Sequence, residues 1–173
     1  SEYMLACSWN AELARKMGEG VGEDGLHGGI VGWYGPGMNI HRTPFAGRNF
    51  EYYSEDAFLS GILGRAEVAG AAEKGMYAFI KHFALNDQET HRDHLGIVTW
   101  AQEQAIREIY LKPFEMTIVD NNVTIKYNEP IRNEKGDITG YTSKTAEVPA
   151  ASAVMSSFNR IGATWAGGNF DLL

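Results

Sequence analysis

Two polar clusters in this chain carry side chains suited to holding a polar ligand. The first spans residues 47–56 and contains Arg48 and Glu51, and the second begins about thirty residues later with Lys81 and His82. Each cluster follows a short apolar run that is typical of a strand. Buried Arg, Lys and His side chains are costly unless a ligand or a network of ion pairs compensates them. The two clusters therefore predict one shared polar pocket.

The composition argues against several classes of partner. The 173 residues carry a net charge of -7 and no basic stripe, so nucleic acid, whose phosphates need positive charge, is not expected. No apolar run approaches the roughly 20 residues that cross a bilayer, so no membrane partner is expected either. The single cysteine, Cys7, cannot form an internal disulfide. It leaves the localisation unknown and favours a reducing, cytoplasmic compartment only slightly.

Strands and helices are predicted to alternate along the chain. Three short apolar runs predict strands at residues 30–34, 76–80 and 153–157. Three stretches with apolar residues at helical spacing predict helices, which begin after the caps Ser8 and Ser54 and after the capping-box sequence Thr99-Trp100-Ala101-Gln102. Such alternation favours an α/β fold with a parallel sheet and right-handed crossovers.

Residues 121–152 interrupt this alternation. Two β-prone runs at 123–127 and 138–142 flank a turn-like sequence and predict an inserted hairpin. A lid, a subunit contact and a neutral decoration are all open interpretations of it. Without the insertion the strands recur about every 45 residues, as strand-loop-helix units do. A closed eight-stranded barrel needs about 250 residues, so three units predict an incomplete structure.

The polar residues all follow the carboxyl ends of the predicted strands, where parallel α/β folds place their functional groups. They are Arg48 and Glu51 after the first strand, Lys81, His82, Asn86, Glu89 and Arg92 after the second, and Met155, Phe158 and Asn159 at the third. Convergence of three loops favours a binding pocket. A structural interpretation competes at individual positions, because Arg48 could serve only to pair with Glu51 and Lys81 only to form a salt bridge.

Longer motifs resemble a known family. They are NIHRTPFAGRNFEYYSED at residues 39–56, KHF at 81–83, NDQE at 86–89 with Arg92, REIYLKPF at 107–114 and VMSSFN at 154–159. In this order, and over nearly the whole chain apart from residues 121–152, they are similar to glycoside hydrolase family 3 of the β-glucosidase type.

The resemblance implies a fold and a reaction. Residues 1–173 would form part of the family's N-terminal domain, a partial (β/α)8 TIM-type barrel of about three strand-helix units with the hairpin inserted at 121–152. The reaction would be retaining, exo-acting hydrolysis of the non-reducing-end β-glycosidic bond, which needs two carboxyl groups about 5 Å apart. In the family both lie downstream of Leu173, so no catalytic residue is expected in this segment.

The resemblance also carries sugar-binding roles over to this sequence. Substrate binding is implied for Arg48, Lys81, His82, Arg92, Met155 and Phe158. Glu51, three residues from Arg48, is expected in a supporting role that orients the Arg48 guanidinium, and Glu89 is expected to support its loop, with sugar contact as the alternative. Lys and Arg side chains donate charge-assisted hydrogen bonds, which suits sugar hydroxyls. The implied partners are a β-linked oligosaccharide or β-glucoside and the remainder of the enzyme, which completes the barrel.

No cofactor and no metal are expected. His91 and His94, with Asp93 nearby, have a spacing that metal sites use, but they lack a convincing third ligand, which favours an ordinary surface loop. The glycine-rich segment at residues 32–37 suggests a weaker alternative, a phosphate-binding α/β domain. Its order is not that of the dinucleotide fingerprint, and Pro36 interrupts it.

Two departures from common family patterns bear on function. Phe158 stands where a Tyr is common, and if that Tyr tunes the nucleophile, Phe keeps the packing and loses the hydroxyl. The sequence FALND at residues 83–87 replaces the Pro-Gly-His-Gly type loop of N-acetylglucosaminidases, which favours a glucosidase. The alternative is a non-catalytic carbohydrate-binding or degenerate member of the family.

Overall fold

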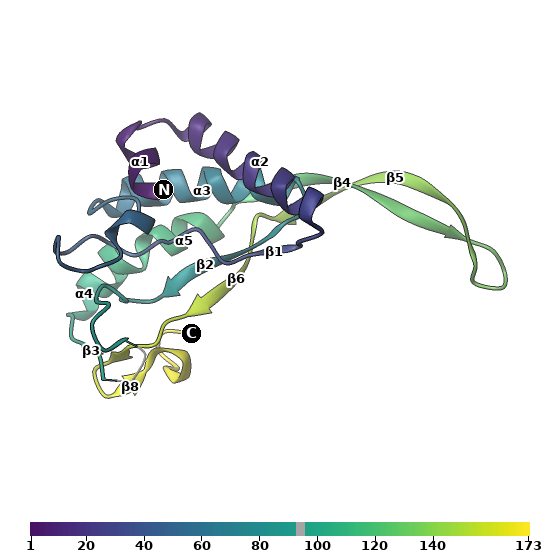
Figure 1. The fold of residues 1–173 in the computed structure, drawn as a ribbon. Helices are drawn as coiled ribbons and strands as arrows, with labels where there is room; N and C mark the ends of the chain where they lie inside the picture. The colour runs from purple at the N-terminus through teal and green to yellow at the C-terminus, as the bar shows by residue number, and fades with distance from the viewer. Residues whose placement is uncertain (93–95) are drawn as a thin grey trace.

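The computed structural model describes residues 1–92 and 96–173, and its centre is a three-stranded parallel sheet (Figure 1). The strand order is β1 (Gly32–Trp33), β2 (Tyr77–Phe83), β6 (Ala151–Ser156). All three predicted strands are therefore present. The second is longer than expected, because its pairing with β6 continues to Phe83 opposite Ser156. Lys81 and His82 consequently lie on the strand and not in the loop after it.

Helices cover one face of this sheet (Figure 1). They are α1 (Glu2–Cys7), α2 (Ala11–Gly28), α3 (Ala57–Glu73), α4 (Glu103–Ala105), the π-helical turn η3 (Ile106–Tyr110) and α5 (Lys112–Ile118). Gly18 of α2 and Gly70 of α3 let these two helices cross closely, since a Cβ at either position would collide with the backbone of the other helix. Within the described residues no helix is long and apolar enough to cross a membrane.

All three predicted helix caps are wrong. Asn10 caps α2 by accepting a hydrogen bond from the Leu13 amide at 3.0 Å, whereas Ser8 ends α1. Asp56 caps α3 by accepting from the Leu59 amide at 2.7 Å, and Ser54 instead accepts from the Asp56 amide. A carboxylate or amide two residues further on displaced the predicted serine in both cases.

The third cap fails because Thr99 belongs to a strand. A second small sheet joins β3 (Val98–Thr99) to β7 (Arg160–Ile161) and β8 (Thr164–Trp165). The Thr99 hydroxyl donates to the Leu85 carbonyl at 3.2 Å, and α4 begins after Gln102 without a side-chain cap. Strands of two residues are too short to leave a periodic pattern in a sequence. Two short 3-10 helices are η1 (Asn49–Glu51) and η4 (Ala166–Gly168).

A long hairpin projects from the body, as the sequence predicts (Figure 1). Its strands are β4 (Asn122–Arg132) and β5 (Ile138–Pro149), paired antiparallel from Asn122 opposite Pro149 outward. At its base Val123 joins the core cluster, and Ile125 and Val148 pack against that cluster. The hairpin enters at the amino end of β6, opposite the end where the polar clusters lie. That residues 121–152 are an insertion relative to the family stays a prediction.

The helix layer contains one unusual buried carboxyl group. Glu67 lies on α3 with 2% of its surface exposed, and the Tyr53 hydroxyl donates to its Oε2 at 2.6 Å. Burial raises the pKa of Glu67 to about 7, against the opposing effect of that hydrogen bond and with a further contribution from the negative charge of Glu2. Folding therefore favours the protonated form of this side chain.

This pKa predicts a pH-dependent loss of stability. The folded-state pKa lies above the unfolded value, so the stabilising protonated form is present at low pH and is lost as the pH rises from about 4.5 to about 7. The cost above that window is roughly 3 kcal/mol at most. In the full-length protein, Glu67→Gln keeps an acceptor for Tyr53 and removes the charge. We expect its thermal midpoint to exceed the parent's at pH 8 and to match it near pH 4.5.

Thermal unfolding followed between pH 4.5 and pH 8 measures this effect. Glu134→Gln is the matched control, because Glu134 is exposed in the hairpin turn and its substitution should leave the midpoint unchanged at every pH. A Glu67→Gln effect of equal size at all pH values would contradict the assignment.

Candidate functional site

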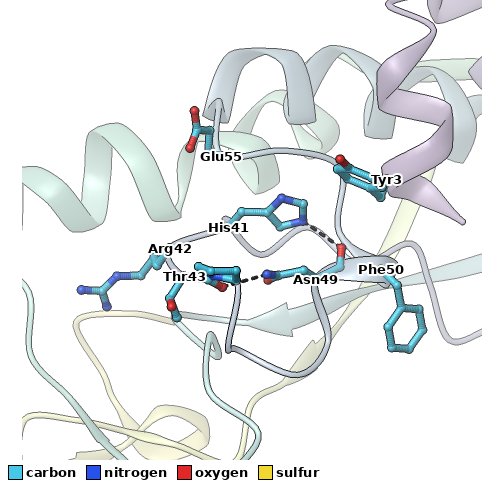
Figure 2. Close-up of a pocket in the computed structure, with 8 residues that line it drawn as sticks. Tyr3, His41, Arg42, Thr43, Asn49, Phe50 and Glu55 are labelled. Carbon is cyan, nitrogen blue, oxygen red and sulfur yellow. Dashed lines mark hydrogen bonds between the residues drawn. The ribbon is translucent and has the colours of Figure 1, made fainter.

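The loop that carries Arg48 is folded by hydrogen bonds across its own span (Figure 2). His41 Nε2 lies 2.8 Å from the Asn49 carbonyl and 3.1 Å from the Tyr52 carbonyl. Both partners are acceptors, so Nε2 carries the proton. Asn49 Nδ2 donates to the Thr43 carbonyl at 2.8 Å. These bonds set the position of η1 and with it the positions of Arg48 and Glu51.

Five predicted site residues form one alternating chain of charges. The Glu51 carboxylate pairs with Arg48 Nε, and its other oxygen lies 3.3 Å from Lys81 Nζ. Glu89 Oε2 lies 2.9 Å from Arg92 Nε and 3.7 Å from Arg48 Nη1. The three cationic side chains are 18–21% exposed. The structure thus brings together residues from three separate segments, with three cations sharing two carboxylates.

His82 lies against the same charges and stays neutral. Its side chain is buried on β2. Burial, together with the positive charges of Arg48, Lys81 and Arg92, lowers the pKa of His82 to about 3. Four of the six residues to which the family resemblance assigned substrate binding, Arg48, Lys81, His82 and Arg92, are therefore neighbours in space.

The two predicted residues of the third strand lie beside this group. Phe158 is 46% exposed, and the guanidinium carbon of Arg92 lies 5.1 Å from the centre of its ring. Met155 is half-buried on β6, between the pairs Ile80–Val154 and Phe83–Ser156. Met155 is thus next to the section of β2 that carries the charged cluster.

Comparison with known proteins identifies the family. Residues 1–128 match the model of the glycosyl hydrolase family 3 N terminal domain. The chain belongs to this family. A β-glucosidase of Ruminococcus albus is 36% identical over 169 residues, which are 98% of this chain and 15% of that protein. β-Glucosidase A of Butyrivibrio fibrisolvens is 44% identical over 119 residues, 69% of this chain and 14% of that protein.

Solved structures of the family confirm the fold. β-Glucosidase 3B of Thermotoga neapolitana in complex with glucose superimposes with a TM-score of 0.75 at 36% identity, covering 95% of this chain and 19% of that chain. The β-glucosidase of Kluyveromyces marxianus in complex with glucose gives a TM-score of 0.79 at 25% identity, covering 100% of this chain and 17% of that chain. The segment is part of a (β/α)8 barrel and spans about one seventh of the curated relatives' length.

Sequence reasoning missed two residues that hold His82 in this family 3 segment. Asn39 accepts from the His82 amide at 2.8 Å and donates to the His82 carbonyl at 2.9 Å. The Tyr52 hydroxyl lies 3.2 Å from His82 Nδ1. Both residues are in the quoted family motif, yet nothing in their local sequence shows a partner 43 or 30 residues away. The motif itself is the only signal that could have found them.

Other residues have structural roles. Asp87, to which the sequence assigned no role, lies 3.2 Å from Arg42 Nη1 and ties two loops together. Ser157 Oγ and Asn159 Nδ2 both donate to the Ala84 carbonyl, at 3.0 and 3.1 Å. They join the loop after β6 to the loop after β2.

Neither a metal site nor a phosphate cradle emerges from the part of the chain that the structure describes. Within it no three His, Cys, Asp or Glu side chains gather closely enough to hold a metal ion. His91 is exposed, and His94 and Asp93 lie outside the described residues. At the glycine-rich segment, Gly37 rests against the Glu51 carbonyl and the Tyr52 ring. The side of Gly37 on which a Cβ would lie is therefore packed against other parts of the chain.

A cavity of about 460 Å³ lies beside the loop of residues 41–55 (Figure 2). Its lining residues are Tyr3, His41, Arg42, Thr43, Pro44, Asn49, Phe50 and Glu55. None of the predicted binding residues is among them. The cavity therefore borders the hydrogen bonds that fold the loop and is distinct from the charged cluster.

The double pairing of Glu51 predicts a large effect of its removal. In the full-length protein, Glu51→Gln leaves Arg48 and Lys81 without a shared counter-charge, and losing one partner of a largely buried ion pair typically costs about 3 kcal/mol. We expect a clear drop in the thermal midpoint. Glu89→Gln is the control, because its side chain is 39% exposed against 13% for Glu51. An equal drop in the thermal midpoint for the two variants would show that Glu51 contributes no more to stability than Glu89 does.

Proposed function

We propose that this segment belongs to a retaining, exo-acting β-glycosidase of the β-glucosidase type and supplies residues that bind the non-reducing-end sugar. The observation that supports this most is the cluster of Arg48, Lys81 and Arg92 around neutral His82. It lies at the carboxyl ends of parallel strands, where barrel enzymes bind substrate. Curated relatives named β-glucosidases match this sequence, and solved β-glucosidases in complex with glucose share its fold.

The chemistry of the cluster suits a sugar. Arg48, Lys81 and Arg92 offer N–H groups in excess of what Glu51 and Glu89 accept, and hydroxyl oxygens accept such charge-assisted hydrogen bonds. The carboxylates hold the cations in place before the ligand arrives. A preorganised site of this kind loses little side-chain freedom on binding. Glu51 and Glu89 are both engaged in ion pairs with these cations.

Bond cleavage is assigned to carboxyl groups outside residues 1–173. In retaining hydrolysis one carboxylate attacks the anomeric carbon while a carboxylic acid protonates the departing oxygen. Water then attacks the glycosyl-enzyme ester, giving up a proton to the same residue, now a base, and the nucleophile is released. The segment's contribution is to hold the glycone still while this exchange takes place.

The alternative is a carbohydrate-binding member without catalysis. Phe158 favours it, because this side chain offers no hydroxyl to a neighbouring nucleophile. Incubation of the full-length protein with an activated 2-deoxy-2-fluoro-β-glucoside separates the two functions. We expect one carboxylate to be labelled, downstream of Leu173. Binding of glucose without any labelled carboxylate would favour the non-catalytic alternative.

Lys81 provides the quantitative test of sugar binding. A lost charge-assisted hydrogen bond costs about 1.5–3 kcal/mol, so Lys81→Ala should weaken glucose binding by about 10- to 100-fold. Titration calorimetry on the full-length protein measures this change. Lys112→Ala is the control, because the Lys112 side chain is 40% exposed and pairs only with Glu115 among the described residues. Unchanged affinity in Lys81→Ala would remove this residue from the site.

The neutrality of His82 predicts a flat pH dependence of glucose binding. With a pKa of about 3 the ring does not titrate between pH 5 and pH 8, unlike an ordinary His with a pKa near 6.5. The glucose affinity of the full-length protein should therefore show no His transition in this range. A step near pH 6.5 that disappears in His82→Gln would show that the ring is protonated and would contradict the assignment.

A further inference from the structure

The two ring nitrogens of His82 have different surroundings. Nδ1 lies 3.2 Å from the Tyr52 hydroxyl and 3.2 Å from Asn39 Oδ1. Nε2 has no hydrogen bond to any residue in the described part of the chain, and Arg48, Lys81 and Arg92 lie around the ring. Which nitrogen holds the single proton decides whether His82 offers a donor or an acceptor to a ligand.

The orientation of the Asn39 amide is determined by backbone groups of known polarity. The His82 N–H donates to Oδ1, and Nδ2 donates to the His82 carbonyl. If the Asn39 amide were flipped, its Nδ2 would face the His82 N–H, two donors, and its Oδ1 would face the His82 carbonyl, two acceptors. The atom that faces Nδ1 is therefore an oxygen, and it already has the His82 amide as its donor.

Tyr52 supplies the second constraint. Its side chain is 2% exposed, and its hydroxyl finds its partner, among the described residues, in His82 Nδ1. Burial raises the pKa of Tyr52, so the hydroxyl keeps its proton. Were Nδ1 protonated, this buried O–H would have no acceptor, which is costly. With Nδ1 unprotonated, both the hydroxyl and Asn39 Oδ1 are satisfied.

We propose that Tyr52 is a positioning residue that holds His82 as its Nε2–H tautomer, so that His82 is a neutral hydrogen-bond donor to the sugar. The sugar-facing half of this proposal rests on the proposed function. The sugar oxygen that His82 meets then acts as an acceptor. His82 adds directional recognition without placing a fourth positive charge beside Arg48, Lys81 and Arg92.

The first measurement needs no sugar. In the ligand-free, full-length protein, 15N chemical shifts of the His82 ring, assigned by their loss in His82→Ala, should show a bare Nδ1 and a protonated Nε2. In Tyr52→Phe the acceptor requirement disappears, and the proton should move to Nδ1, where Asn39 Oδ1 accepts it. A protonated Nδ1 in the parent protein would overturn the proposal.

The second measurement reads the ligand side. Inhibition constants are compared for glucose and for its deoxy and deoxyfluoro analogues at C2, C3, C4 and C6. Removing a hydroxyl that His82 contacts should weaken binding to the parent protein but not to His82→Ala. The ring position that shows this difference is the one that His82 contacts. Fluorine accepts but cannot donate, so at this position the parent should tolerate fluorine better than hydrogen. In Tyr52→Phe that advantage should be lost, a change of about tenfold in relative affinity.

Tyr53→Phe is the matched control. It removes a buried hydroxyl hydrogen bond from the neighbouring residue, but that hydroxyl faces Glu67 and not His82. It should lower stability and leave both the 15N pattern and the fluorine preference as in the parent. If Tyr52→Phe behaves like Tyr53→Phe, the role of Tyr52 is merely structural and the proposal fails. Absence of any sugar binding with the 15N pattern intact would count against the proposed function and would leave the tautomer standing.

Discussion

The carboxylate of Glu51 is the contact on which the site depends. It pairs with Arg48 in its own loop and with Lys81 on β2, and Arg48 continues through Glu89 to Arg92. Three positive charges this close together repel one another, and the alternating carboxylates offset that repulsion. Because the cations are held together, burial and their combined charge keep His82 neutral. In the proposed function, a neutral imidazole among fixed cations would recognise the sugar by hydrogen bonding instead of charge.

The sequence predicted the parts of the fold that have strong periodic or motif signals. The three parallel strands, the hairpin and the convergence of the polar clusters at one end of the sheet are all present. The errors are local. Asn10 and Asp56 cap the helices instead of the predicted Ser8 and Ser54. Several residues near a helix start can act as its cap, and the sequence alone does not show which of them has the right geometry. The second sheet was missed since each of its strands has two residues.

The residues that hold the site in place were the hardest to predict. Asn39 and Tyr52 contact His82 across 43 and 30 residues, and His41 folds its own loop through backbone carbonyls. Composition and periodicity report local structure, whereas these hydrogen bonds exist only once β2 and the Arg48 loop lie side by side. The family motif marked the region but not the pairs. The family motif thus supplied the proposed ligand-binding side chains, while the contacts of Asn39 and Tyr52 with His82 needed coordinates.

The hairpin can now be placed relative to this site. It ends at Pro149, and β6 begins at Ala151 and runs away from it toward Met155 and Phe158. The six residues of β6 separate its amino end, where the hairpin lies, from its carboxyl end by about 20 Å. The hairpin also projects away from the body (Figure 1). A lid must reach over the carboxyl ends of the strands, so the lid interpretation does not fit. Half-exposed Tyr127 and Ile131 lie on the same face as the packed Ile125, and the ion pair of Glu129 with Lys144 lies between them. In barrels the amino ends of the strands serve stability more than chemistry, and the hairpin belongs to that end.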